Sequence, residues 1–494
     1  MTTSRPDRSG QHMARIRRTL ARQALMREPN RPSKGARRRF PVLPLLAACC
    51  LLAVALVAGM ASAQVTSVTV DSSKPFEKVD GYTYVEATMH GTVEREDGSV
   101  GEYSVPMILI YPDDGGNGVG VVDWPNWAYY VMTGFEDLDE WMTIEYTRRN
   151  TEGYLFENGY TYASVQWSKN VVELFADVPP GEDSNHLVRG TIERGTDAFP
   201  ILRDAARFLK DPSTFEDANG PLPVEAVLSS GFSLTAGLQN QFLLVGENLD
   251  DDVPVYDGHL LAMTNLGCEA PRDEGPIYGG NVPCPEVPVG RGDTPILVIQ
   301  GQTDVELGGA AAARGEDDPH WRQYQLAGVS HLPAPIFPGL SEVQDPVDPR
   351  PVFRAAFRNL TRWVTEGTPA PPSMFIEGTV GDDGRFTPSV DGDGNALGGL
   401  RLPHMEQELD GEMAGAPLGT YAGVNPADPE DLLALLSGTF TPFSDEELAG
   451  RYPDHETYVS RVARAADYLL ERGYILEVDR DAYVAEAEQS SISR

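Results

Sequence analysis

The sequence predicts an α/β fold with a mostly parallel, doubly wound sheet, and three observations carry this prediction. Short apolar runs of strand length alternate with stretches of helical periodicity, such as residues 196–210. Residues 294–300 (TPILVIQ) form an almost continuous apolar run, which is typical of a strand buried on both faces of a parallel sheet. Residues 224–246 change from an apolar strand to a helical pattern at Ser233, within a few residues.

The turn at Ser233 reads Gly231-Phe232-Ser233, and a helical pattern follows from Leu234. A serine in a sharp strand-to-helix turn presents its hydroxyl above the sheet and leaves the next backbone N–H, here that of Leu234, available to an oxyanion. A lone G-x-S in a chain with 49 glycines is more often an ordinary loop. The functional interpretation therefore depends on an acid and a histidine elsewhere in the chain.

An acid and a histidine do follow in the order that such a serine requires. Asp304 comes just after the apolar run 294–300, at the carboxyl end of a predicted central strand, where open α/β sheets place their chemistry. His331 follows residues 321–326, which alternate like a strand. Glu306 is the alternative acid. The other histidines fit a structural role better or lie outside the expected loops: His259, His320, His404 and His455.

The amino terminus predicts a signal peptide. Residues 1–40 hold 12 Lys and Arg against two acids, and the uncharged stretch 41–63 ends in Ala-Ser-Ala before Gln64. This order predicts cleavage between Ala63 and Gln64 and a secreted or periplasmic protein. An uncleaved anchor is the alternative, because the apolar stretch is long enough to span a bilayer. Residues 37–40 (RRRF) leave a twin-arginine export route open.

The charge balance excludes whole classes of partner. Removal of residues 1–63 leaves 27 basic against 72 acidic side chains, a net charge of about −45. A surface so acidic does not attract nucleic acid or anionic lipid. We therefore expect no nucleic-acid partner, and no membrane partner after signal cleavage.

The two cysteines that remain after cleavage, Cys268 and Cys284, lie in a Pro- and Gly-rich stretch. In an exported protein this spacing predicts one disulfide, with two free thiols as the alternative. The stretch 265–293 connects two predicted strands whose ends would build the site. It is therefore a candidate lid or pocket wall.

The predicted core spans residues 64–372, and residues 373–494 form a hairpin and helical extension packed on it. The core begins with antiparallel strands within 65–105, followed by separate strands at 107–111 and 118–123. The last of these leads into Trp124-Pro125-Asn126-Trp127. In this fold that turn would supply the second oxyanion N–H, so Asn126 and Trp127 are candidate oxyanion and substrate contacts, although no H-G-G-G sequence occurs there.

One stretch invites a calcium-binding interpretation, residues 391–395 (DGDGN). An EF-hand loop requires glycine at its sixth position and glutamate at its twelfth, where this chain has Ala396 and Leu402. A polar hairpin turn explains the stretch better. The sequence therefore predicts neither a metal nor a cofactor.

Several segments together resemble the bacterial "alpha/beta hydrolase domain" family: GFSLTAGLQNQFLL, TPILVIQGQTD, LAGVSH, FRNLTRWVTEGTPAPPS, GNALGGLRLP and RYPDHETYVSRVARAADYLLERGY. The resemblance implies an α/β-hydrolase fold with Ser233 as nucleophile, Asp304 as acid and His331 as base. It also implies an oxyanion hole built from Leu234 N–H and a backbone group near Asn126. Thr235 stands where many hydrolases have the second glycine of G-x-S-x-G.

The function implied is that of an exported serine hydrolase that cleaves a small-molecule carboxylic ester through an acyl-enzyme. Serine is a weak nucleophile at neutral pH, so the histidine must accept its proton and the acid must hold the imidazole. A peptidase or amidase on the same triad is an alternative. A catalytically silent binding protein is another, since fold does not dictate function. Neither the substrate nor the oligomeric state follows from these motifs.

Overall fold

The structure of this 494-residue chain is a computed structural model that describes residues 62–76, 79–125, 153–168, 190–217, 220–250, 252–268, 271, 294–309, 319–427 and 431–494. The predicted signal segment before residue 62 lies outside these ranges. Within them, no helix combines the length and apolar character that crossing a membrane requires.

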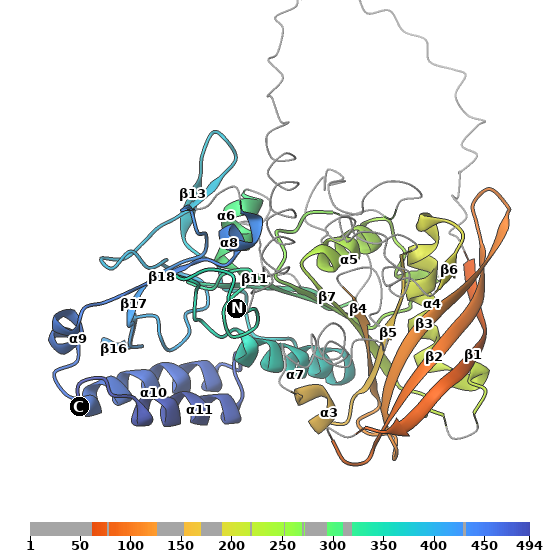
Figure 1. Cartoon of the computed structure of the whole chain (residues 1–494), viewed down its shortest axis with the longest axis horizontal. Helices are drawn as coiled ribbons and strands as arrows, with labels where there is room; N and C mark the ends of the chain where they lie inside the picture. The colour runs from red at the N-terminus through yellow and green to blue at the C-terminus, as the bar shows by residue number, and fades with distance from the viewer. Residues whose placement is uncertain are drawn as a thin grey trace, which may run out of the picture.

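A ten-stranded mixed sheet forms the centre of the molecule, with strand order β1-β2-β3-β5-β4-β7-β10-β11-β12 and β6 (Thr191–Ile192) beside β3 (Figure 1). The antiparallel part comprises β1 (Ser62–Pro75), β2 (Tyr82–Glu94) and β3 (Val100–Pro112), and β3 also pairs antiparallel with β5 (Thr161–Val165). The pairing of β3 with β6 is antiparallel as well. The other pairings are parallel and join neighbouring strands in the order β5, β4 (Val119–Trp124), β7 (Ala226–Phe232), β10 (Gly258–Ala262), β11 (Ile296–Gly301) and β12 (Trp321–Leu326).

Helices cover both faces of the parallel part, as a doubly wound fold requires. Successive side chains of a strand point to opposite faces. Val227 packs in one apolar cluster with helices α4 (Ala198–Lys210) and α5 (Leu234–Leu244). Its neighbour Leu228 packs in another with α7 (Arg350–Glu366). β11, whose apolar run predicts burial on both faces, is buried along its whole length.

β3 differs from the prediction, which has strands within 65–105 and a separate strand at 107–111. It is one strand of 13 residues that runs through Pro106. On the side away from β2, β3 pairs with β6 at Tyr103–Ser104 and with β5 from Met107 onward. Pro106 lies between these two pairings, so its missing N–H costs the sheet no ladder hydrogen bond.

After α7, the described residues form three small antiparallel pairs and four helices. The pairs are β13 (Gly378–Val380) with β14 (Phe386–Pro388), β15 (Gln407–Leu409) with β16 (Glu412–Ala414), and β17 (Gly419–Ala422) with β18 (Thr439–Pro442). The helices are α8 (Leu432–Leu436), α9 (Asp445–Arg451), α10 (His455–Glu471) and α11 (Glu477–Gln489). Short elements elsewhere are α3 (Tyr154–Glu157), α6 (Gln302–Gly308), β8 (Leu249–Asp250) and β9 (Val253–Pro254).

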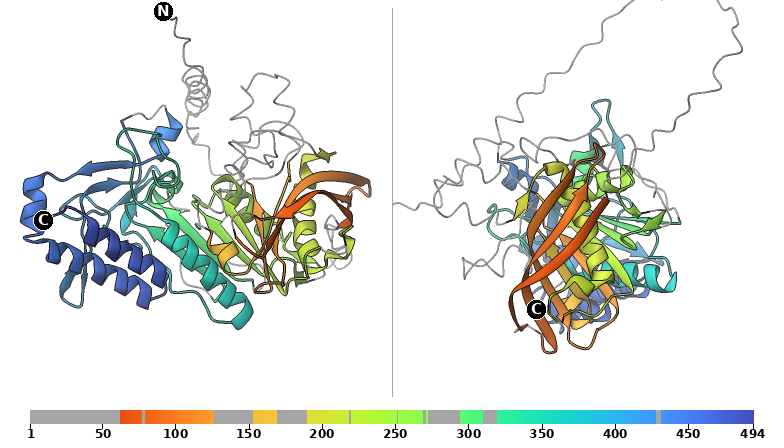
Figure 2. Two further views of the ribbon diagram at one scale, coloured as in Figure 1. Left: turned by 60° about the horizontal axis from the view of Figure 1, so that its bottom comes forward. Right: turned by 90° about the vertical axis from the view of Figure 1, so that its right-hand side faces the viewer.

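This carboxyl-terminal region packs against the β12 end of the sheet, opposite the long strands β1–β3 (Figure 2). Main-chain bridges join Tyr324 to Met374 and Leu326 to Leu400, so residues of this region cover the outer edge of β12. Its buried side chains Leu402 and Leu469 belong to the same apolar cluster as β7 and α7. The region therefore shares the core of the sheet.

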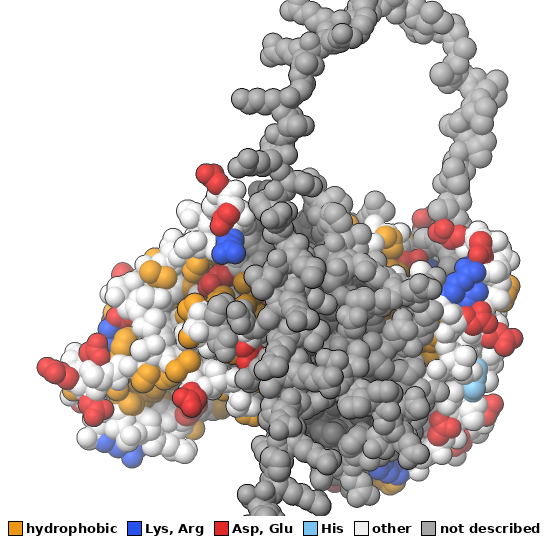
Figure 3. All heavy atoms as spheres, turned by 45° about the horizontal axis from the view of Figure 1, so that its top comes forward, with side chains coloured by type: hydrophobic (Ala, Val, Ile, Leu, Met, Phe, Trp, Pro, Cys, Tyr) orange, Lys and Arg blue, Asp and Glu red, His pale blue; other side chains and the backbone are white. Residues whose placement is uncertain are grey.

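On the face drawn in Figure 3, acidic side chains occur at several separate places. Asp and Glu side chains occur there at both ends of the molecule, and Lys and Arg side chains lie among them. The high net negative charge of the sequence is therefore spread over separate elements on this face.

Candidate active site

Ser233 forms the whole connection between β7 and α5. Its backbone has φ 55° and ψ −110°, a combination that L-residues seldom adopt. Its N–H donates to the carbonyl of Ala262 at the end of neighbouring β10, at 2.9 Å. The strained turn is therefore held by the adjacent strand, and it places the serine at the carboxyl edge of the sheet.

Gly231 and Thr235 keep this turn tight. A Cβ atom on residue 231 would lie 2.4 Å from Oε1 of Gln239 and 2.9 Å from the carbonyl carbon of Thr235, so only glycine fits without movement of α5. The Thr235 hydroxyl accepts a hydrogen bond from the N–H of Phe232 at 3.0 Å and donates to the carbonyl of the same residue at 3.1 Å. Threonine at the position of the second glycine thus ties the turn together.

Asp304 and His331 follow β11 and β12, the two strands that lie beyond β10 in the sheet. Gly301 at the end of β11 lies opposite Leu326 at the end of β12, so the loops that follow both strands leave the same edge. Asp304 is in the first turn of α6, where its Oδ2 accepts the N–H of Gly301 at 2.8 Å. His331 follows β12 by five residues, in a loop.

The three side chains form one continuous hydrogen-bonded line. Nδ1 of His331 lies 2.6 Å from Oδ1 of Asp304, and Nε2 of the same ring lies 2.9 Å from Oγ of Ser233. When Nδ1–H donates to the carboxylate, Nε2 is left to accept the serine hydroxyl. The structure therefore brings together the three residues that the sequence singles out, from loops at three strand ends.

The line is shielded from solvent. Asp304 and His331 are 4% and 8% exposed. The ring of Phe232 packs edge-on against the His331 ring, with centroids 5.7 Å apart, and Phe337 lies 6.0 Å from Phe232. These aromatic side chains lower the local dielectric, which strengthens charge interactions within the line.

The alternative acid, Glu306, lies in a different environment. Its Oε1 accepts a hydrogen bond from the side chain of Gln302 at 2.7 Å, within the same helix. Burial raises the pKa of its carboxyl. His331 binds Asp304 instead.

The other histidines have structural surroundings. His259 is fully buried in β10, where Nδ1 lies 2.6 Å from Oγ of Ser229, and burial lowers its pKa to about 3. His404 packs on the ring of Tyr421, and burial lowers its pKa to about 4. The ring nitrogens of His455 face the carbonyls of Ile492 and Glu488, and His320 lies directly before β12.

The candidate oxyanion donor Leu234 is the first residue of α5. The first four N–H groups of a helix have no partner within the helix, and they carry the positive end of its dipole. The N–H of Leu234 therefore lies directly after the serine with the right polarity. The other candidates, Asn126 and Trp127, lie outside the described residues.

Cys268 is fully buried, and Nδ2 of Asn240 donates to its sulfur at 3.6 Å. Cys284 and most of the candidate lid 265–293 lie outside the described part of the chain. The Cys268–Cys284 disulfide stays a prediction.

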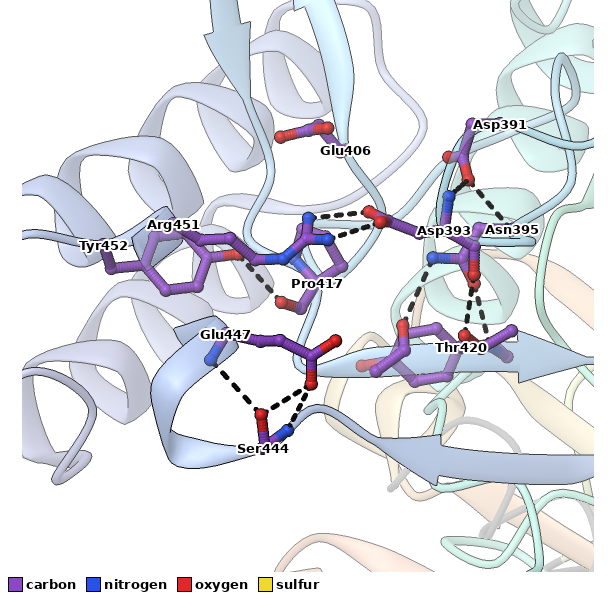
Figure 4. Close-up of polar contacts among 12 residues, drawn as sticks. Asp391, Asp393, Asn395, Glu406, Pro417, Thr420, Ser444, Glu447, Arg451 and Tyr452 are labelled. Carbon is purple, nitrogen blue, oxygen red and sulfur yellow. Dashed lines mark hydrogen bonds and ion pairs between the residues drawn. The ribbon is translucent and has the colours of Figure 1, made fainter. Parts of the chain in front are cut away.

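The calcium-like stretch 391–395 forms an internal contact (Figure 4). Asp391 accepts the N–H groups of Asp393 and Asn395 and pairs with Arg401 at 2.9 Å. Asp393 pairs with Arg451 of α9. Two arginines thus supply the positive charge that a cation would provide. Across the described ranges, no group of three or more His, Cys, Asp or Glu could hold a metal ion.

Two side chains that the sequence analysis does not single out contact the histidine loop. The Thr303 hydroxyl accepts the N–H of His331 at 2.9 Å, and Oδ2 of Asp345 accepts the N–H of Ser330 at 2.7 Å. Burial raises the pKa of Asp345 to about 7. The sequence gives only a weak signal for Thr303, namely that it is a hydroxyl residue next to Asp304. Asp345 has no local signal, because it lies 15 positions from its partner.

The sequence profile of a family described as "Alpha/beta hydrolase domain" matches residues 79–485, most of the chain. The chain belongs to this family. The match and the sheet order together confirm the predicted α/β-hydrolase fold with its antiparallel amino-terminal strands. Membership of this family also indicates that the protein is a hydrolase in the general sense.

Among solved structures, the chain is similar to the rice cell wall degrading esterase LipA from Xanthomonas oryzae, at 11% identity and a TM-score of 0.25, over 40% of this chain and 50% of LipA. It is also similar to a putative acetyl xylan esterase from Bacteroides fragilis, at 11% identity and a TM-score of 0.30, over 63% of this chain and 74% of the other. The chain thus spans about half the length of LipA. No curated protein sequence matches it.

Proposed function

We propose that this protein is an exported serine hydrolase that cleaves carboxylic esters through a covalent acyl-enzyme. The observation that carries the proposal is the line Ser233–His331–Asp304, with contacts of 2.9 and 2.6 Å at the carboxyl edge of the sheet. Membership of a hydrolase family and the strained serine backbone support it.

In the first half-reaction Ser233 attacks the ester carbonyl while Nε2 of His331 accepts the hydroxyl proton. The separation of 2.9 Å is within the range for proton transfer. Asp304 holds the imidazole through Nδ1–H and stabilises the imidazolium that forms. Because its second oxygen accepts the N–H of Gly301, the carboxylate keeps a fixed orientation.

The tetrahedral intermediate needs donors for its oxyanion. The N–H of Leu234 supplies one, worth roughly 3 kcal/mol of barrier reduction. A backbone N–H near Asn126 is the expected second donor. His331 then returns the proton to the leaving alcohol, and water completes the cycle by hydrolysing the acyl-enzyme with the same base.

Export is the second part of the proposal. The first strand, β1, begins at Ser62, beside the predicted cleavage site between Ala63 and Gln64. Cleavage there would remove the first two residues of β1 and leave Gln64 as the first residue of the strand. A Cys268–Cys284 disulfide fits the oxidising compartment that export implies.

The test is hydrolysis of p-nitrophenyl esters of graded acyl length by purified protein, with the matched p-nitroanilides as amide substrates. We expect ester turnover, lost by a factor on the order of 10⁵ or more in Ser233→Ala. Ser230→Ala is the matched control, because residue 230 lies on the same strand and its side chain makes no hydrogen bond to any of the three residues. A folded wild type that hydrolyses no ester contradicts the proposal, and faster cleavage of anilides identifies an amidase instead.

A further inference from the structure

We propose that the carboxyl-terminal region is part of the active site, because Gly423, Leu436, Ser437 and Gly438 hold the loops that carry Asp304 and His331. We call these four residues the C-terminal support. Thr303 is the positioning residue through which the support acts on His331. The inference rests on the proposed function and adds residues to its machinery.

The first contact runs through the Thr303 hydroxyl, which is fully buried. This hydroxyl donates to the carbonyl of Gly423 and accepts the N–H of His331 at 2.9 Å. Thr303 directly precedes Asp304 in α6. One hydroxyl group therefore connects the acid, the main chain of the histidine and the C-terminal support.

Gly423 lies so close to the acid loop that a side chain would not fit. A Cβ atom there would lie 2.6 Å from the N atom of Thr303 and 2.8 Å from Cβ of Gln302. Contacts below 3.0 Å require one side to move, and one of these two is to backbone. The support is therefore in direct packing contact with the residues that place Asp304.

The second contact is made on the histidine loop. The N–H of Leu332 donates to the carbonyl of Leu436 at 3.0 Å, and the N–H of Asp345 donates to the carbonyl of Ser437 at 3.1 Å. A Cβ on Gly438 would lie 2.7 Å from Cβ of Ser330.

Together these contacts fix three consecutive N–H groups. The N–H of Ser330 is held by the Asp345 carboxylate, that of His331 by the Thr303 hydroxyl, and that of Leu332 by the Leu436 carbonyl. His331 lies in a loop without helix or strand hydrogen bonds of its own. Its ring must nevertheless contact Asp304 and Ser233 simultaneously. The support supplies the rigidity that the loop lacks.

Displacement of a catalytic group by about 1 Å can cost about 10²-fold in rate. Loss of the Thr303 hydroxyl frees the His331 N–H and breaks the link to Gly423, so it should lower kcat. Substrate binding does not use this hydroxyl, so KM should change little. A purely structural role would instead lower stability and leave kcat per folded molecule unchanged.

The experiment compares Thr303→Val, Thr303→Ser and Thr420→Val in the full chain, with p-nitrophenyl ester hydrolysis as the assay. Valine keeps the shape and removes the hydroxyl, and serine restores it. Thr420→Val is the matched control: Thr420 lies on β17, and its hydroxyl donates to the carbonyl of Asp393 at 2.7 Å rather than to either loop (Figure 4).

We expect kcat to fall about 10²-fold in Thr303→Val with KM nearly unchanged, to recover in Thr303→Ser, and to equal wild type in Thr420→Val. A folded Thr303→Val protein with wild-type kcat overturns the inference while leaving the proposed function intact. If Thr303→Val does not fold, Asp345→Asn is the second test of the inference. This substitution removes one hydrogen-bond acceptor of the histidine loop, so it should also lower kcat and leave KM nearly unchanged. An inactive wild type refutes both proposals.

Discussion

Replacement of Asp345 by asparagine should remove a pH-dependent cost from the native state. The carboxylate is fully buried and accepts the N–H groups of Ser330 and Val347, at 2.7 and 2.9 Å. Burial raises its pKa from 3.8 to about 7, and these hydrogen bonds offset only part of the rise. The charge of Asp345 also helps to raise the pKa of Tyr421, after the larger effect of burial.

The direction in which stability changes with pH follows from a comparison of the unfolded and native states. In the unfolded chain Asp345 ionises as the pH rises through its ordinary value of 3.8, whereas in the native protein it keeps its proton until about pH 7. The native state therefore binds more protons in this window, and its stability falls as the pH rises. Integration from pH 5 to pH 8 gives a loss of about 3 kcal/mol from this one group.

Asparagine does not titrate, so the Asp345→Asn variant lacks this loss. The variant also loses one hydrogen bond, which costs about 1 kcal/mol or more at every pH. The stability difference between variant and wild type contains the cost of the lost hydrogen bond, which is the same at every pH. The change of this difference with pH therefore reports only the titration of Asp345.

Urea unfolding of wild type and variant at pH 5, 6, 7 and 8, followed by tryptophan fluorescence, measures this difference. We expect the variant to gain about 3 kcal/mol relative to wild type across the range. Asp382→Asn is the control, because Asp382 is exposed in the turn between β13 and β14. A stability difference that stays constant for Asp345→Asn would refute the reasoning.

Three further predictions concern local contacts. Gly231→Ala should destabilise the protein by about 1–3 kcal/mol, because the new methyl overlaps Gln239, and calorimetry should show a lower Tm; an unchanged Tm would contradict the packing. Thr235→Val should lower ester turnover, because the hydroxyl no longer ties Phe232, and Thr235→Ser should restore it; equal kcat in all three proteins would refute this role. Chelation by EDTA should leave the Tm unchanged, because arginines already pair with the acids of 391–395, and a drop restored by Ca²⁺ would show a metal there.

The parts of the site that the sequence predicts are those with a local pattern. The apolar run of β11, the strand-to-helix change at Ser233 and the place of Asp304 after its strand each depend on neighbouring residues only. The chain order then indicates which histidine to consider. The family match confirms the fold that these patterns predict.

The remaining features depend on contacts between distant residues. Thr303 and Gly423 lie 120 positions apart, and Asp393 and Arg451 lie 58 apart. The stretch 391–395 illustrates the consequence, because its acids would look the same with calcium or with arginine as the partner. Periodic patterns in the sequence do not indicate such pairings. The role of the C-terminal support is therefore visible only in the folded chain.

The most direct measurement of the central claim is the mapping of a fluorophosphonate adduct by mass spectrometry. A serine activated as proposed should take up one adduct per folded molecule, on the peptide that contains Ser233, and His331→Ala should abolish the labelling although the serine remains. A folded wild type that stays unmodified, or one modified at another residue, would contradict the account.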